Sequence, residues 1–179
     1  MYSKNLDVNN GRGLLLYINS SLKSQEIEIC SAFEENMFVE VELNGHNKLL
    51  IGLIYRSENG TAENNVMLNS LLTEARKLRH SHLLLMGDFN FPNICWANNS
   101  TSSSITSPDS LFLECVEENF LLQNVDKPTR WRGSNNPHIL DLIITNEEDM
   151  ISILIYMIVL WARVTTVHFF LMIYVDPNL

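Results

Sequence analysis

A strand, a helix and a second strand follow one another in the middle of this chain, and this order limits the folds that it can adopt. The nearly continuous apolar run Leu49–Tyr55 is typical of a buried strand, and Leu83–Met86 is a shorter run of the same kind. Between them, over Ala62–Arg79, apolar side chains recur with the i, i+3, i+4, i+7 spacing of a helix that buries one face. One helix therefore connects two strands.

Further elements flank this unit. Gly13–Ile18 and Phe38–Leu43 are also rich in apolar, strand-forming residues, and the turn-rich segment Asn44–Asn47 predicts a hairpin between the second of them and the buried strand that follows. A second helix is expected after Ser107, which favours the N-cap position and precedes a proline, and a buried strand is expected at His138–Thr145. Helices and strands alternate after the hairpin, which predicts a mixed α/β class.

Length and charge narrow the function classes. At 179 residues, the chain holds one domain of ordinary size or a large fragment of a bigger one. The formal net charge of −9 excludes a basic field that would attract nucleic acid or anionic lipid, so any DNA contact has to be local or bridged by a metal ion. Cys30, Cys95 and Cys115 are far apart and indicate neither a disulfide framework nor a zinc site. A reducing, intracellular compartment, nuclear or cytoplasmic, is therefore expected.

The C-terminal segment differs in composition from the rest of the chain. Apolar residues dominate positions 150–179, where Arg163 and Asp176 are the charged side chains. A membrane span needs about 20 apolar residues, and the run Met150–Ala162 is shorter than that. We therefore expect a domain over residues 1–149 and an apolar tail over 150–179 that does not enter a membrane. A small membrane-anchored protein is the alternative.

The strongest local signal for chemistry follows the second buried strand. After Gly87 come Asp88, Phe89 and Asn90, so a carboxylate and a carboxamide lie two residues apart and would share a face in extended chain. At the carboxyl end of a strand, Asp88 can orient and deprotonate water or support a metal ion, and Asn90 can donate hydrogen bonds to a phosphate. The alternative is an Asx turn that closes the strand.

This segment resembles the endonuclease/exonuclease/phosphatase superfamily, and more narrowly the endonuclease domain of non-LTR retrotransposons of the jockey and RTE type. The resemblance spans Gly11–Asn146 and rests on five blocks in the family's order, which are Tyr55-Arg56, Gly87–Asn90, Asn93–Trp96, Pro128–Arg130 and Leu140–Ile143. It implies a partial α/β sandwich of mixed sheets flanked by helices. It also implies a hydrolase that uses a divalent ion, usually Mg²⁺, to nick DNA, with a reverse transcriptase domain as its partner in a full-length element.

Carried over by position, the resemblance implies a role for individual residues. Asp88 matches the acid that orients water, Asn90 an amide at the phosphate, and Asp141 the carboxylate that orients a catalytic histidine. The positions that match the substrate side are Tyr55, Arg56, Thr129 and Arg130. A strand-end aromatic and an ordinary turn threonine are the alternatives for Tyr55 and Thr129.

A basic and aromatic cluster follows in the sequence. Arg130 and Arg132 flank Trp131, and such a group can touch DNA through phosphate contacts and stacking. Surface arginines beside a core tryptophan are the alternative. The cluster is therefore a candidate nucleic-acid contact.

Two motifs of the resembled family have no counterpart in this sequence, namely a metal-binding glutamate before the Gly11 segment and a Ser-Asp-His after Asp141. The metal ligands are therefore left unassigned. Codons for Trp161–Phe170 can be chosen so that another reading frame encodes Gly-Lys-Ser-Asp-His, which suggests a frameshift near Ser152–Leu154. We hypothesise a truncated endonuclease domain with impaired catalysis. A non-catalytic binding module that keeps the fold is the alternative.

Overall fold

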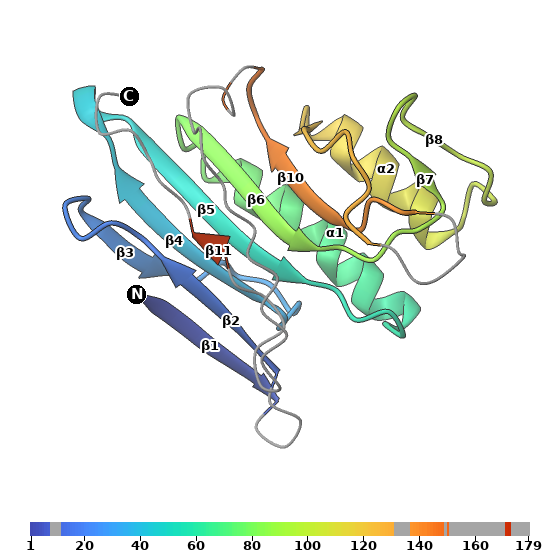
Figure 1. Ribbon diagram of the computed structural model, residues 1–179, viewed down its shortest axis with the longest axis horizontal. Helices are drawn as coiled ribbons and strands as arrows, with labels where there is room; N and C mark the ends of the chain where they lie inside the picture. The colour runs from blue at the N-terminus through green and yellow to red at the C-terminus, as the bar shows by residue number, and fades with distance from the viewer. Residues whose placement is uncertain (8–11, 131–136, 149, 151–170, 173–179) are drawn as a thin grey trace.

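A computed structural model describes residues 1–7, 12–130, 137–148, 150 and 171–172. In this part of the chain a mixed sheet of six strands forms the centre of the domain (Figure 1). The strands in spatial order are β3 (Ser24–Ile27), β4 (Asn36–Glu42), β5 (Lys48–Tyr55), β6 (His82–Asp88), β10 (Asp141–Thr145) and β9 (Leu122–Gln123). Strands β5 and β6 run parallel, and the other neighbours are antiparallel.

Helices α1 (Ala62–Lys77) and α2 (Pro108–Glu118) lie together on one face of this sheet (Figure 1). Each helix begins at a hydroxyl N-cap, because Thr61 Oγ1 accepts from the Asn64 N–H at 3.1 Å and Ser107 Oγ accepts from the Ser110 N–H at 3.2 Å. Apolar side chains of both helices pack on β4, β5, β6 and β10 in one core cluster. Both predicted helices are confirmed.

A smaller sheet covers part of the opposite face. It consists of β1 (Tyr2–Asp7), β2 (Arg12–Tyr17) and β11 (Leu171–Met172), with β1 antiparallel and β11 parallel to β2. Leu14 and Leu16 of β2 join a second core cluster with the apolar side chains of β4, β5 and β6 that face away from the helices. The central sheet is thus buried on both faces, which explains why β5 and β6 are nearly continuous apolar runs.

Strand lengths depart from the sequence expectation in two places. β6 continues through Gly87 to Asp88, because β5 and β10 both pair with it there. β10 starts at Asp141, and His138 takes part only in an isolated bridge to Arg130. The expected hairpin between β4 and β5 is confirmed, with the short 3₁₀ helix η1 (Asn44–His46) in its turn.

Several strands escaped the sequence analysis because they are polar or very short. They are β1, β3, β9 and the two arms of a small hairpin, β7 (Ile94–Cys95) and β8 (Ser100–Thr101). Most of the apolar tail lies outside the described residues. Within the described ones, no helix is long and apolar enough to cross a membrane.

Candidate functional site

The site residues gather where the parallel strands β5 and β6 end. Tyr55 of β5 pairs with Asp88 of β6, and Asp88 pairs with Asp141 of β10. Because paired residues project from the same side of a sheet, these three side chains form one row. Tyr55 packs against the second core cluster, so this row lies on the face away from the helices. The sheet therefore brings together residues that are far apart in the sequence.

Two carboxyl groups sit side by side in this row. Asp88 is buried, and its pKa is raised to about 7, first by burial and then by the neighbouring charge of Asp141. Burial also raises the pKa of Asp141, against the effects of Thr129 and of the positive charge of Arg130. Among the described residues, no group forms a hydrogen bond with Asp141 Oδ1, although this atom is buried. The pair therefore favours a shared proton or a bound cation.

Thr129 and Arg130 lie beside the carboxyl pair. The Thr129 hydroxyl oxygen accepts the N–H groups of Leu140 at 3.1 Å and Asp141 at 3.0 Å, so it fixes the start of β10. The positive charge of Arg130 lowers the pKa of both carboxyl groups. The other members of the predicted basic cluster, residues 131 and 132, lie outside the described residues.

Asn90 does not share an extended strand with Asp88, so this part of the sequence prediction is wrong. The chain turns after β6, and Asn90 has a φ of 51°, in the left-handed region. Its backbone N–H donates to Asp88 Oδ1 at 3.2 Å, which is the predicted alternative of an Asx turn. Its side-chain Nδ2 donates to the carbonyl of Arg56 at 2.9 Å. The carboxamide is therefore tied to the end of β5.

Arg56 is buried inside the domain, with 6% of its surface exposed. Its Nε donates to Asn65 Oδ1 at 2.7 Å, and its Nη1 donates to the carbonyl of Asn90 at 2.7 Å. The guanidinium carbon lies 4.2 Å from the ring centre of Phe91, within the range of a cation–π contact. The predicted contact of Arg56 with a substrate would require the side chain to leave these partners.

Asn65, which was not predicted from the sequence, anchors Arg56 from helix α1. Asn65 lies on the buried side of the helix with Leu68 and Leu72, at the i, i+3, i+7 spacing. A polar residue within an apolar stripe is the signal that could have identified it, because a buried carboxamide needs hydrogen-bond partners. Asn65 therefore belongs to the surroundings of the site.

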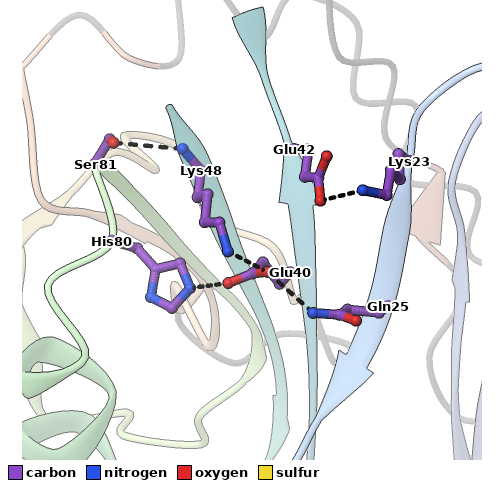
Figure 2. Close-up of polar contacts among 7 residues, drawn as sticks. All are labelled: Lys23, Gln25, Glu40, Glu42, Lys48, His80 and Ser81. Atoms are coloured by element: carbon purple, nitrogen blue, oxygen red, sulfur yellow. Dashed lines mark hydrogen bonds and ion pairs between the residues drawn. The ribbon is translucent and has the colours of Figure 1, made fainter. Parts of the chain in front are cut away.

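A second buried carboxylate lies on the helix-covered face, toward the amino end of β5. Figure 2 shows Glu40 of β4 between Lys48 Nζ at 2.8 Å, His80 Nε2 at 2.7 Å and Gln25 Nε2 at 3.1 Å. These bonds, that of Lys48 first, lower the pKa of Glu40 to about 2. The group links β3, β4, β5 and the segment before β6. It stabilises the sheet at a distance from the carboxyl pair.

The donor set at the carboxyl pair fits a divalent cation only in part. The oxygens of Asp88 and Asp141 are the kind of ligand that Mg²⁺ prefers, and Mg²⁺ is often held by one or two carboxylates together with water and substrate phosphate. The buried Asp141 Oδ1 has no donor among the described residues and can accept a cation. Within this part of the chain, no cluster of three or more His, Cys, Asp or Glu side chains is present.

Known proteins similar to this chain include members of an endonuclease family. The sequence matches the family model described as "endonuclease-reverse transcriptase" over residues 49–167, a range that contains every predicted site residue. No curated protein matches the sequence. The predicted resemblance is confirmed at the level of the family.

The fold resembles that of a solved endonuclease domain. The endonuclease domain of TRAS1, a telomere-specific non-LTR retrotransposon, superposes with a TM-score of 0.55 at 14% identity, over 77% of this chain and 59% of that domain. An endonuclease/exonuclease/phosphatase family protein from Leptotrichia buccalis gives 0.40 at 14% identity over 70% and 50%. The 3′ phosphatase NExo from Neisseria, bound to product DNA hairpin, gives 0.40 at 15% over 68% and 56%. The predicted α/β class is confirmed, and the chain spans 59% of the TRAS1 domain.

Proposed function

Because this chain belongs to the endonuclease–reverse transcriptase family and has an endonuclease-like fold of the retrotransposon type, we propose that its site acts on the phosphodiester backbone of DNA with a divalent metal ion. We further propose that hydrolysis at this site is impaired. In a full-length element, a reverse transcriptase domain would be the partner that uses the product. The carboxyl pair of Asp88 and Asp141 is the observation that carries the proposal.

The chemistry of the pair supports this proposal. Asp88 has a pKa of about 7, so near neutral pH it can accept a proton from a water molecule placed for attack. Asp141 and Arg130 flank it, and both influence its charge state. Tyr55 ends the same row, and by the family resemblance it would contact the substrate phosphate. A bound Mg²⁺ would supply positive charge at the phosphate and would favour the ionised form of both carboxyl groups.

We propose that hydrolysis is impaired because the sequence lacks the histidine motif expected to partner Asp141. The resemblance assigns to this carboxylate the task of orienting a histidine, and the sequence contains no Ser-Asp-His. In the part of the chain that the structure describes, Asp141 Oδ1 has no hydrogen-bond donor. Loss of a general acid or base typically lowers a rate by about 10²–10⁴-fold. Binding without efficient cleavage is the behaviour that we propose.

Binding of DNA should depend on a divalent cation and on Asp141. With a fluorescently labelled duplex, we expect Mg²⁺ to support binding and EDTA to abolish it, because a net charge of −9 provides no general attraction for phosphate. Asp141→Asn should weaken the Mg²⁺-dependent binding about tenfold, since one carboxylate oxygen becomes an amide. Fluorescence anisotropy at constant ionic strength measures both effects.

Glu117→Gln is the matched control, because it removes the same charge from the exposed side of α2 and should leave binding unchanged. Denaturing gels of the same samples report hydrolysis, and intact strands are expected. Equal binding in Mg²⁺ and EDTA would contradict a cation site. Efficient nicking that disappears in Asp88→Ala would contradict the proposal that hydrolysis is impaired. It would not contradict the cation site.

The coding nucleotides test the proposed frameshift independently of any assay. We expect the codons of Trp161–Phe170 to encode Gly-Lys-Ser-Asp-His in another frame, because the sequence of this segment permits such codons. These residues lie outside the described part of the chain. Sequencing of the genomic copy and its transcript decides the matter, and the frameshift is refuted when neither alternate frame encodes Ser-Asp-His.

A further inference from the structure

The turn that carries Asp88 and Asn90 is attached to the end of β5 by both the backbone and the side chain of Arg56. The Arg56 backbone N–H donates to the carbonyl of Asp88 at 2.8 Å, and its own carbonyl accepts from Asn90 Nδ2 at 2.9 Å. Its guanidinium donates to the carbonyl of Asn90 at 2.7 Å. One residue thus contacts the start and the end of the turn.

The shape of this turn depends on Asn90, which adopts a left-handed backbone conformation. Asparagine tolerates this conformation better than other residues with a side chain, because its short polar side chain can form local hydrogen bonds. The hydrogen bond from the Asn90 N–H to Asp88 Oδ1 exists only while the turn keeps this shape. Any residue that fixes Asn90 therefore also orients the Asp88 carboxylate.

The position of Arg56 is not explained by stability alone. A buried guanidinium loses its hydration, and burial lowers the pKa of Arg56 against the charges of Asp109, Asp88 and Glu35. Within the described residues, no carboxylate forms a salt bridge with it. An apolar side chain could fill the same space against Phe91 without this cost, but it could not bind both Asn65 and the Asn90 carbonyl.

We infer that Arg56, anchored by Asn65, is a positioning residue that holds the Asp88–Asn90 turn in its working shape and does not contact DNA. This inference rests on the proposed function only in treating the turn as part of a site. The planar guanidinium supplies two donors that point in different directions, one toward helix α1 and one toward the turn. A lysine keeps the charge but cannot reproduce this geometry.

Amide hydrogen exchange of the ¹⁵N-labelled chain, without metal or DNA, tests the inference. In the wild-type protein, the buried Asn90 amide should exchange slowly. Asn65→Ala and Arg56→Lys should each accelerate its exchange by about tenfold, which corresponds to about 1.4 kcal/mol of local opening, while amides in the centre of β5 stay protected. Because neither a cation nor DNA is present, this readout is independent of whether the proposed function holds.

Asn69→Ala is the matched control. Asn69 also lies on α1 and donates one hydrogen bond, to the carbonyl of Leu111 on α2, so its loss should leave Asn90 exchange unchanged. Unchanged exchange of Asn90 in both Asn65→Ala and Arg56→Lys would overturn the inference. Wild-type exchange of Asn90 in Arg56→Lys, together with faster exchange in Asn65→Ala, would overturn the role of the guanidinium geometry. If Arg56→Lys fails to fold, Asn65→Ala alone decides, because it leaves the charge in place.

Discussion

Gly87→Ala is expected to destabilise the folded domain by about 4 kcal/mol or to prevent folding. A Cβ atom at this position would lie 1.7 Å from the carbonyl oxygen of Ile54, the residue that pairs with Gly87 across β5 and β6. The φ of Gly87 is also +146°, a conformation that residues with a side chain rarely adopt. The two central strands would have to separate next to Asp88, and each of the two effects costs about 1–3 kcal/mol.

Urea unfolding followed by circular dichroism measures this loss. Gly45→Ala is the control, because Gly45 also has a positive φ, +69°, but nothing lies within 4 Å of its Cβ position. The control should lose about 1 kcal/mol, which is the cost of the backbone conformation alone. Equal losses in the two variants would show that the close approach of β5 to β6 does not constrain the sequence at Gly87.

The second large effect is a fall in stability as the pH rises toward neutrality. The pKa of Asp88 is about 7 in the folded state and 3.8 in its ordinary state, so the folded domain prefers the protonated form. This contribution is complete below pH 3.8 and is lost as the pH rises through about 7. About three units at about 1.4 kcal/mol per unit give on the order of 4 kcal/mol, as an upper value.

Denaturant unfolding between about pH 5 and pH 8 measures this dependence. Asp88→Asn should flatten it, because the amide stays neutral throughout. Mg²⁺ should offset the loss at the alkaline end when a cation binds the ionised pair. Glu40→Gln is a useful comparison, because the pKa of Glu40 is lowered to about 2 and its contribution disappears only as the pH falls below about 4.5. An unchanged slope in Asp88→Asn would contradict the burial of an uncharged Asp88.

The elements that the sequence predicted are those whose own residues determine them. Helices α1 and α2 have apolar stripes and hydroxyl N-caps, and β4 and β5 have apolar runs on either side of a turn. Strands β1 and β3 are polar and form because a neighbouring strand offers hydrogen-bond partners, which a local pattern cannot reveal. For the same reason, β6 extends through Gly87 to Asp88 beyond its apolar run.

For the site, the sequence identifies the residues but not their geometry. The sequence identified Asp88, Asn90, Thr129 and Asp141 as candidates, but their mutual placement depends on strand register between distant segments. Neither the raised pKa of Asp88 nor the fixed position of Asn90 follows from local sequence, because the first depends on burial and on Asp141 of β10 and the second on a hydrogen bond from Arg56. The roles that the family resemblance assigns to these residues stay predictions.

The position of β10 within the sheet has a consequence for folding during synthesis on the ribosome. β10 follows β6 by more than fifty positions in the chain, yet it lies directly beside it, between β6 and β9. Until residue 145 has emerged, β6 has no partner on that side and presents an open edge for about 3–10 seconds at ordinary rates of synthesis. The carboxyl pair of Asp88 and Asp141 therefore assembles only when β10, the last strand of the central sheet to be synthesised, closes that edge.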